Sequence, residues 1–275
     1  SIHAIAEAMK LGFADRSIAL GDPDFVSVDT ERLTSKAYAA KRFRLIGGHA
    51  GEYAPAEGIE AKEYPGNTSH FSIMDRFGNA VSQTQTVRDW FGSGIAVEGL
   101  GFVLNNAMSD FSAAAGAMTS QGLAYGNANS IAGGKTPLSS MSPSIVLKDK
   151  KPYLAIGSAG GPRIITGTLQ GIINAIDFDM NPEQLVNAPY VNCLTREQGL
   201  EAEFGISQDT LRLLEERGHK PVCIEADQAM STMVNSVMLK DGEYYAAGTK
   251  RVDGCGGVLL SNGNIILEGI SQEIS

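Results

Sequence analysis

Cysteine is scarce in this chain, with three residues among 275. They lie far apart, at Cys193, Cys223 and Cys255. Because their number is odd and no two have CxxC or CxxH spacing, the sequence predicts neither a disulfide framework nor a zinc site, and we expect buried free thiols. Histidine is nearly as rare and occurs singly, at His3, His49, His70 and His219. Without HxxE or HxH spacing, the sequence supports neither a metal site nor a Ser-His-Asp triad.

Long apolar runs and excess positive charge are also absent. Polar residues and glycine interrupt the apolar stretch at residues 164–176 before it reaches the roughly 18 residues of a membrane helix, so we expect no membrane span. The net charge is −9 and no run of Lys and Arg offsets it locally, which argues against nucleic acid as a partner. Residues 1–10 have an amphipathic helix pattern that predicts no signal peptide, so the compartment, periplasmic or cytoplasmic, stays open.

The composition is that of an ordered globular protein. Hydrophobic residues make up 43% of the chain, charged residues make up 19%, and 32 residues are glycine. These proportions exclude a disordered or fibrous chain, and the length of 275 residues predicts one or two domains with a real core.

Hydrophobic periodicity predicts helices and antiparallel hairpins. Apolar residues recur at helical spacing over residues 2–13, 163–178 and 209–217, the last with Ser207 as a candidate N-cap and Gly218 as a stop. A period of two around turn signals predicts three hairpins, formed by residues 71–73 with 80–86, 144–147 with 153–157, and 233–239 with 243–247. Residues 27–66 should be mixed helix and loop ending in a polar linker, and residues 112–134 a long lid or mobile loop. Helices and strands segregate, which predicts layers of α and β.

The candidate nucleophile lies where the polar linker meets the first predicted strand. In the run Asn67-Thr68-Ser69-His70, the Thr68 hydroxyl could attack the preceding carbonyl, cut the chain and leave Thr68 with a free α-amine as its own general base. Thr86 could neighbour Thr68 across the hairpin, although a structural Thr–Thr cross-strand pair is the alternative. His70 lies on the same strand, where a structural or positioning role is favoured over that of a base.

Other residues could bind a substrate or an oxyanion. Gly160 and Gly161 follow a strand and precede a helix, so their N–H groups could stabilise developing negative charge; a tight turn is the alternative. Ser139 and Ser140 place paired hydroxyls before a strand, but alone they predict only a turn. The Asp110 carboxylate could equally cap a helix or turn or contact a ligand.

Arg88 is a candidate clamp for a substrate carboxylate. It lies just past Thr86 and beside Asp89 and Trp90, the single tryptophan of the chain. A guanidinium can hold a carboxylate through two parallel hydrogen bonds. The alternative is a surface ion pair between Arg88 and Asp89.

Together and in this order, these segments closely resemble the γ-glutamyltranspeptidase family of N-terminal nucleophile hydrolases. The resemblance covers most of the chain. It runs through Ala14-Asp15-Arg16, Leu20-Gly21-Asp22-Pro23-Asp24-Phe25, Thr68-Ser69-His70-Phe71-Ser72, Asp75, Gly78-Asn79-Ala80-Val81, Phe91-Gly92-Ser93-Gly94, Leu104-Asn105-Asn106, Met108, Asp110-Phe111, Pro137-Leu138-Ser139-Ser140-Met141-Ser142-Pro143 and Gly157-Ser158 with Gly160-Gly161.

The resemblance implies an α+β fold, a four-layer αββα sandwich, and self-cleavage of a precursor between Asn67 and Thr68. Thr68 would be the nucleophile and Thr86 the second threonine that hydrogen-bonds to it. The backbone of Gly160 and Gly161 would form the oxyanion hole. The positions that match substrate-binding residues are Ser139, Ser140 and Asp110. The reaction would be acyl transfer from a small-molecule amide to water or an amine, with no metal or organic cofactor.

Two departures from the family pattern bear on the substrate. Ala107 stands where the family usually has Gln, and Arg88 stands where it usually has Asn. The resemblance implies a γ-glutamyl compound or a related acid amide as the substrate. Losing an amide side chain and gaining a cation fits the second of these, an amide of another carboxylate-bearing acid. The alternatives are therefore an amidase like the oxamate amidohydrolases or cephalosporin acylases, or an unprocessed, inactive homologue that serves as a scaffold.

The extent of the resemblance predicts how the chain is organised. Residues 1–67 resemble the C-terminal part of the large subunit with its linker, and residues 68–275 resemble the catalytic small subunit. Ser1 corresponds to a position well inside the large subunit, and the tail from about Gly254 departs from the usual ending. We therefore expect an incomplete sandwich that depends on the missing large-subunit portion or on self-association.

Overall fold

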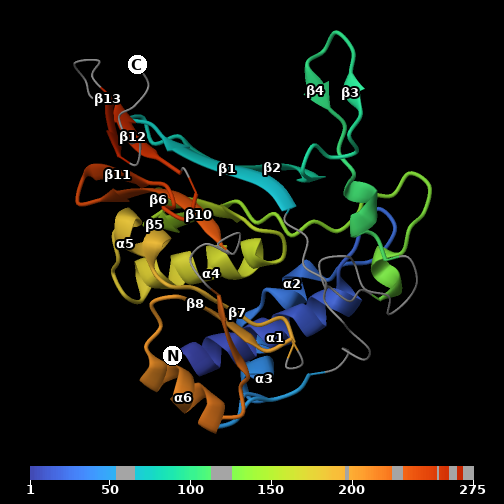
Figure 1. Cartoon of the computed structure of the whole chain (residues 1–275), viewed down its shortest axis with the longest axis vertical. Helices are drawn as coiled ribbons and strands as arrows, with labels where there is room; N and C mark the ends of the chain where they lie inside the picture. The colour runs from blue at the N-terminus through green and yellow to red at the C-terminus, as the bar shows by residue number, and fades with distance from the viewer. Residues whose placement is uncertain are drawn as a thin grey trace. The chain divides into compact units, whose positions relative to one another are not determined.

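The computed structural model describes two compact units built from discontinuous segments (Figure 1). The described residues are 1–53, 66–112, 126–195, 198–224, 232–252, 254–259 and 265–268. Unit 1 comprises Ser1–Tyr64, Asn106–Ser139 and Val191–Ile224, and unit 2 comprises Pro65–Asn105, Ser140–Tyr190 and Glu225–Ser275. Among the described helices, none combines the length and the apolar character needed to cross a membrane. The predicted linker at residues 54–65 and most of the predicted lid, residues 113–125, lie outside the described residues.

The first predicted hairpin is confirmed in unit 2. Strand β1 (Gly66–Met74) pairs antiparallel with β2 (Ala80–Asp89). The Asp75 carboxylate accepts hydrogen bonds from the backbone N–H groups of Phe77 and Asn79, each at 2.9 Å, and Gly78 has a φ of 87°. These features close the turn, because an aspartate side chain at its start and a glycine with positive φ suit a tight connection.

The other two predicted hairpins join in one antiparallel sheet of unit 2. Its strands, in spatial order, are β11 (Glu243–Ala247), β10 (Met233–Lys240), β6 (Lys151–Ala159) and β5 (Ser144–Lys148). The hairpins β5–β6 and β10–β11 are held together where β10 pairs with β6. This long-range pairing places residues that follow the first hairpin beside residues near the end of the chain.

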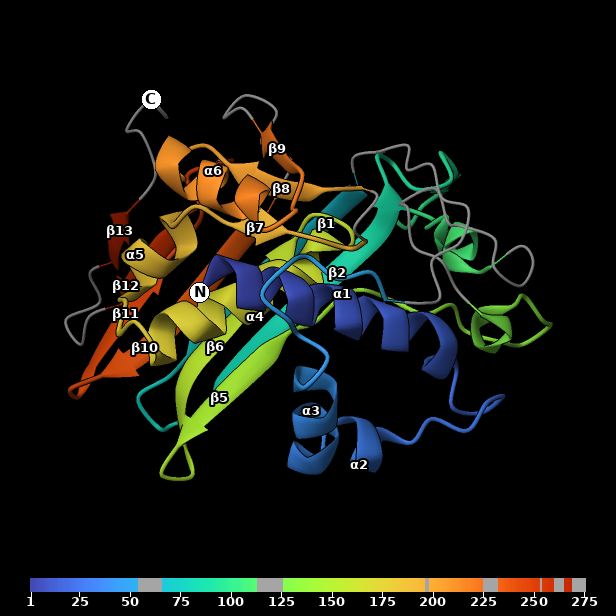
Figure 2. The same cartoon turned by 90° about the horizontal axis from the view of Figure 1, so that it is seen from below.

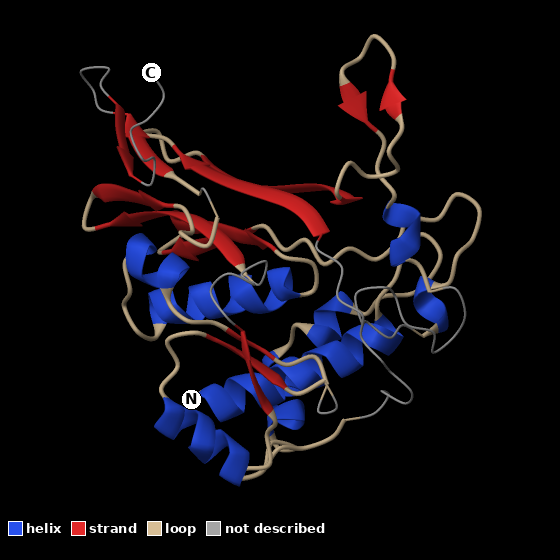
Figure 3. Ribbon diagram, viewed as in Figure 1, coloured by secondary structure: helices blue, strands red, loops and turns tan. Residues whose placement is uncertain are grey.

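The β1–β2 sheet faces the four-stranded sheet of unit 2: β1 lies against β6 and β10, and β2 lies against β6 (Figure 3). The buried imidazole of His70 lies directly over Gly157 on β6, where an added Cβ would come within 2.3 Å of the ring. Asn235 Nδ2 donates to the His70 carbonyl and Ser82 Oγ donates to the Ile156 carbonyl, both at 2.9 Å. Glycine at 157 is therefore a packing requirement of this sheet pair.

Helices cover the opposite face of the larger sheet. Helix α4 (Arg163–Ile176) contacts β6 and β10, and α5 (Pro182–Asn187) contacts β10 and β11. The buried core between them consists of Leu154, Ile156, Ala175, Leu185, Val186, Tyr190, Val234, Met238 and Ala247. Unit 2 thus has the order sheet, sheet, helices, which is three layers of the expected αββα sandwich (Figures 1 and 3). Two further hairpins were not predicted: β3 (Ala96–Val97) with β4 (Phe102–Val103), and β12 (Gly256–Leu259) with β13 (Ile265–Glu268).

Unit 1 is built on the predicted N-terminal helix, α1 (Ile2–Ala19), with α2 (Thr30–Leu33), α3 (Lys36–Phe43) and α6 (Gln208–Glu216). Ser207 Oγ caps α6 by accepting from the backbone N–H of Thr210, and Gly218 follows with a φ of 82°, so both predicted ends are confirmed. A small sheet of β7 (Val191–Asn192), β8 (Leu200–Glu203) and β9 (Pro221–Ile224) was not predicted. Figure 2 shows this sheet between α1 and α6, where side chains of all three form one core.

The expectation of buried thiols holds for one cysteine and is wrong for two. Cys193 is buried in the core of unit 1, and burial raises the pKa of its thiol to about 12. Cys223 and Cys255 are free and exposed. Cys223 lies on β9, an edge strand of the three-stranded sheet.

Candidate active site

The two candidate threonines face each other across the β1–β2 hairpin. Thr68 is paired with Thr86, and the Thr68 hydroxyl donates to Thr86 Oγ1 at 3.2 Å. Thr86 Oγ1 also accepts from the backbone N–H of Arg88 at 2.8 Å. The hairpin thus holds the Thr68 oxygen in a fixed direction, and the accepting Thr86 oxygen increases the negative charge on it.

A β-bulge lies opposite the Asn67–Thr68 peptide bond. Asn67 pairs with Arg88 and Thr68 pairs with Thr86, so Val87 is the extra residue on β2. Arg88 has a φ of 75°, a left-handed conformation that costs a side-chain-bearing residue free energy. The bulge turns the Arg88 N–H toward the threonine pair, so the irregularity is part of the site.

The guanidinium of Arg88 is held inside unit 2. Its side chain is only 4% exposed, and Nη1 contacts both carboxylate oxygens of Asp89, at 2.7 and 2.8 Å. The Arg88–Asp89 ion pair that the sequence offered as the alternative therefore forms. It is not the expected surface pair, because the Arg88 side chain is buried. The role of Arg88 as a substrate clamp stays a prediction.

His70 is a positioning residue of the sheet pair. Its Nδ1 is 2.8 Å from Thr84 Oγ1, and its Nε2 is 2.9 Å from Ser72 Oγ. Burial lowers the pKa of His70 to about 4, so the ring is neutral near pH 7. Both ring nitrogens are engaged, in agreement with the structural role favoured from the sequence.

Gly160 and Gly161 form the turn from β6 into α4. Their φ angles are 127° and 60°, and their carbonyls accept from the N–H groups of Arg163 (3.2 Å) and Ile164 (3.1 Å) at the start of the helix. Such φ values favour glycine and leave the backbone open to close approach. This turn belongs to the same unit as Thr68, and its role as the oxyanion hole stays a prediction.

The predicted substrate-binding residues divide between the two units. Ser140 belongs to unit 2, and its carbonyl accepts from Ser142 Oγ at 2.9 Å. Asp110 and Ser139 belong to unit 1, where Asp110 ends the 3-10 helix η1 (Ala107–Asp110). Their roles in binding substrate stay predictions.

Sequence reasoning missed Asn129, which holds these unit 1 segments together. This fully buried side chain donates from Nδ2 to the Asp110 carbonyl at 2.7 Å and accepts at Oδ1 from the Leu138 N–H at 2.9 Å. Arg16, on α1, donates to the Ser139 carbonyl at 3.1 Å. Asn129 lies at the end of the short 3-10 helix η2 (Asn127–Asn129), in a stretch that carries no periodic signal.

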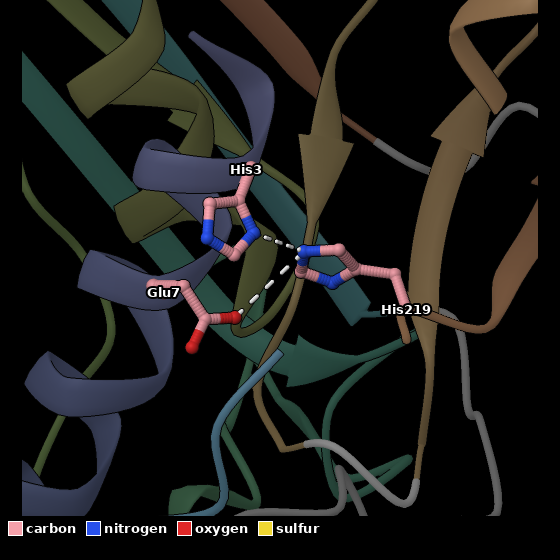
Figure 4. Close-up of side chains that lie close together, drawn as sticks. All are labelled: His3, Glu7 and His219. Carbon is pink, nitrogen blue, oxygen red and sulfur yellow. Dashed lines mark hydrogen bonds and ion pairs between the residues drawn. The ribbon is translucent and has the colours of Figure 1, made fainter. Parts of the chain in front are cut away.

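One group of side chains in the described part of the chain could hold a metal ion. His3, Glu7 and His219 come together in unit 1 (Figure 4). None of them is among the residues that the sequence singled out as candidate catalytic or substrate-binding groups.

Comparison with known proteins shows which family the chain resembles. The gamma-glutamyltranspeptidase family model matches residues 1–258. The glutathione hydrolase proenzyme of Escherichia coli (strain K12) is 42% identical over 262 residues, which are 91% of this chain and 43% of that protein. The chain therefore spans less than half the length of this curated relative.

Several solved structures resemble the chain, including the following two. A crystal structure of a Helicobacter pylori gamma-glutamyltranspeptidase mutant is 40% identical, with a TM-score of 0.62 over 66% of this chain and 99% of that chain. A crystal structure of cephalosporin acylase from Bacillus halodurans is 26% identical, with a TM-score of 0.75 over 92% of this chain and 44% of that chain.

Proposed function

Because the chain belongs to the γ-glutamyltranspeptidase family of N-terminal nucleophile hydrolases, we propose that it carries the catalytic part of an autoprocessing threonine amidohydrolase or acyltransferase. Thr68 is the nucleophile. The observation that carries this proposal is the hydrogen bond from Thr68 Oγ1 to Thr86 Oγ1 beside the bulge at the Asn67–Thr68 bond.

Processing begins with the Thr68 hydroxyl. Its oxygen attacks the Asn67 carbonyl carbon, and the peptide nitrogen leaves with a proton, which converts the peptide bond into an ester. Water then hydrolyses the ester. The products are a carboxylate on Asn67 and a free α-amine on Thr68, which becomes the general base of the mature enzyme.

Turnover uses the same oxygen. Thr68 Oγ attacks the amide carbon of a substrate, and the Thr68 α-amine takes the hydroxyl proton and passes it to the departing amine. The N–H groups of Gly160 and Gly161 stabilise the tetrahedral oxyanion. The acyl group remains on Thr68 as an ester until water or an acceptor amine takes it.

The substrate is a small amide with a carboxylate on its acyl side, such as a γ-glutamyl compound. The name of the E. coli relative, a glutathione hydrolase, supports this class. Asp110, Ser139 and Ser140 bind the acyl group, and Arg88 faces its carboxylate. The cephalosporin acylase likeness and the Arg88 and Ala107 departures favour a second candidate, an amidase for another acid amide.

The partner is a further large-subunit-like region or, failing that, a second copy of the chain. The outer face of the β1–β2 sheet presents Phe71, Ile73 and Val81, which are 41%, 54% and 45% exposed. Ile73 and Val81 are directly paired across the strands, so the apolar surface is continuous. This face is where the fourth layer of the sandwich packs.

Intact mass spectrometry of the purified chain after prolonged incubation tests the processing step. We expect two polypeptides separated at Asn67–Thr68 in the wild type and one in Thr68→Ala. Ser69→Ala is the matched control, because it removes the neighbouring exposed hydroxyl and should be cut normally. A chain that circular dichroism shows to be folded but that stays in one piece would contradict the proposal and favour the unprocessed homologue.

A further inference from the structure

A buried group of metal-binding side chains lies in unit 1, outside the catalytic machinery. His3 and Glu7 project from α1 toward His219, which lies between α6 and β9 (Figure 4). The distance from His3 Nδ1 to His219 Nε2 is 2.7 Å, and that from Glu7 Oε1 to His219 Nε2 is 3.8 Å. One ligand atom from each residue lies within 4.8 Å of the others. Neighbouring ligands of a tetrahedral zinc ion lie about 3.3 Å apart, so small side-chain shifts would complete the geometry.

Outer hydrogen bonds already orient two of these side chains as they do in metal sites. His3 Nε2 is 2.9 Å from the Gly47 carbonyl, which can only accept, so Nε2 carries the proton and Nδ1 presents its lone pair to the cluster. Glu7 Oε2 accepts from the Gly51 N–H and the Tyr53 hydroxyl, each at 2.8 Å. The other oxygen of Glu7, Oε1, is therefore directed at His219.

The tautomer of His3 determines what happens to His219 on binding. Because His3 Nδ1 accepts, His219 Nε2 donates in the metal-free state. An incoming ion takes the place of this hydrogen atom, and the proton moves to Nδ1 of His219. The imidazole remains neutral, which is the ligating form.

The second observation is the state of Glu7 Oε1. The Glu7 side chain is fully buried, and this oxygen forms an ion pair with Lys10 Nζ at 2.7 Å. Lys10 Nζ also donates to the Gly51 carbonyl at 2.6 Å. Lys10 would therefore keep this hydrogen bond when Glu7 Oε1 binds a metal ion. Burial would raise the pKa of Glu7, but hydrogen bonds from Lys10, Gly51 and Tyr53 lower it below the usual value. His3 is partly exposed and provides the entry path.

We propose that His3, Glu7 and His219 bind one divalent transition-metal ion, with Zn²⁺ as the best match to two imidazoles and a carboxylate. His3 and Glu7 precede Thr68, whereas His219 follows it. The ion would therefore link the two polypeptides that processing produces, because each of them would supply at least one ligand. This consequence rests on the proposed cleavage, but the metal site itself does not.

Zn²⁺ titration by calorimetry into the metal-free Thr68→Ala chain tests the site, since this background stays in one piece whether or not the wild type is cut. We expect one ion per chain and a rise in Tm of several degrees. His3→Gln, at the partly exposed ligand, should weaken binding at least about tenfold. His49→Gln, at an exposed histidine outside the cluster, should bind like the parent.

Cobalt(II) absorption distinguishes the ligands. Histidine and carboxylate ligation produces visible bands without the intense near-ultraviolet charge transfer of a cobalt–thiolate bond. Unsaturable binding, unchanged affinity in His3→Gln, or a thiolate band from a cysteine would each overturn the site. To test whether the ion links the two processed polypeptides, a chelator is added during denaturation. It should lower the denaturant concentration at which the two polypeptides separate. If the wild type is never cut, this last measurement falls with the proposed cleavage, while the titration in Thr68→Ala stands.

Discussion

A substitution at Thr86 should test how Thr68 is activated, because it leaves the nucleophile itself in place. Its oxygen accepts from the Thr68 hydroxyl, and Thr86→Val keeps the shape but removes the acceptor. A hydrogen bond to a group that develops charge is worth roughly 1.5–3 kcal/mol, so we expect processing and kcat to fall about tenfold to a hundredfold. Thr86→Ser should restore most of the rate in single-turnover assays. Equal losses in Val and Ser variants would contradict a role for the hydroxyl.

Arg88 should determine preference for acidic substrates. With a charge-assisted contact removed, Arg88→Ala should raise KM for carboxylate-bearing amides by about tenfold or more and leave neutral amides nearly unchanged. Arg76→Ala, at an exposed arginine in the β1–β2 turn, is the control for loss of charge. The measurement is KM on paired acidic and neutral amides. An equal effect on both would refute the clamp and favour a structural role for Arg88.

At the scale of elements, Asn129 links the η1 segment to the residues before Ser139. Asn129→Leu keeps the volume but leaves the Asp110 carbonyl and the Leu138 N–H without this partner. Each loss costs about 1–3 kcal/mol when the group stays buried, so we expect a lower Tm and a raised KM with a smaller change in kcat. Asn127→Ala, at an exposed asparagine of η2, should behave like the wild type in thermal melts and kinetics. A normal KM in Asn129→Leu would show that the link does not position the substrate site.

The β1–β6 contact should make stability depend on pH through His70. Its pKa in the folded chain, about 4, lies below the usual 6.5, so the unfolded chain binds more protons between these values. The contribution of neutral His70 is therefore complete above about pH 6.5 and decreases as the pH falls toward 4, by on the order of 2 kcal/mol. Urea unfolding from pH 7 to 4.5 should show a shallower pH dependence in His70→Asn than in the wild type. Parallel curves would rule out this contribution.

The elements predicted from the sequence are those with strong local signals. The hairpins β1–β2, β5–β6 and β10–β11 have period-two patterns and defined turns, and α4 and α6 have clear apolar faces. The pairing of Thr68 with Thr86 followed from the first hairpin. Strands β7, β8 and β9 have two to four residues each, which is too short for a periodic pattern. They form a sheet only because tertiary contacts bring them together.

Long-range contacts explain what the sequence could not predict at the candidate sites. The bulge at Val87 depends on register, which periodicity alone does not determine. Asn129 has no motif of its own, and its importance comes from the two backbone groups it joins. His219 is far from His3 and Glu7 in the chain, so no local spacing rule could connect them.

At the scale of the whole molecule, the outer face of the β1–β2 sheet should control self-association. Phe71 and Ile73 lie on this face, and an uncovered apolar sheet face favours contact with another surface. The double substitution Phe71→Gln with Ile73→Thr keeps strand-compatible side chains but removes most of the apolar area. In sedimentation velocity over a range of concentrations, we expect the wild type to associate and the double variant to remain a monomer.

The matched control for that experiment is Phe77→Ser. Phe77 is 77% exposed but lies in the turn between the two strands, away from the sheet face. If the face is the contact surface, Phe77→Ser should associate like the wild type although it removes a comparable apolar group. Loss of association in both variants would indicate general hydrophobic attraction, and a monomeric wild type at every concentration would leave the large-subunit-like region as the proposed cover. If the wild type is monomeric, the large-subunit-like region should be co-expressed with it. The double substitution should then weaken binding between the two polypeptides, and Phe77→Ser should not, because the fourth layer packs on the face and not on the turn.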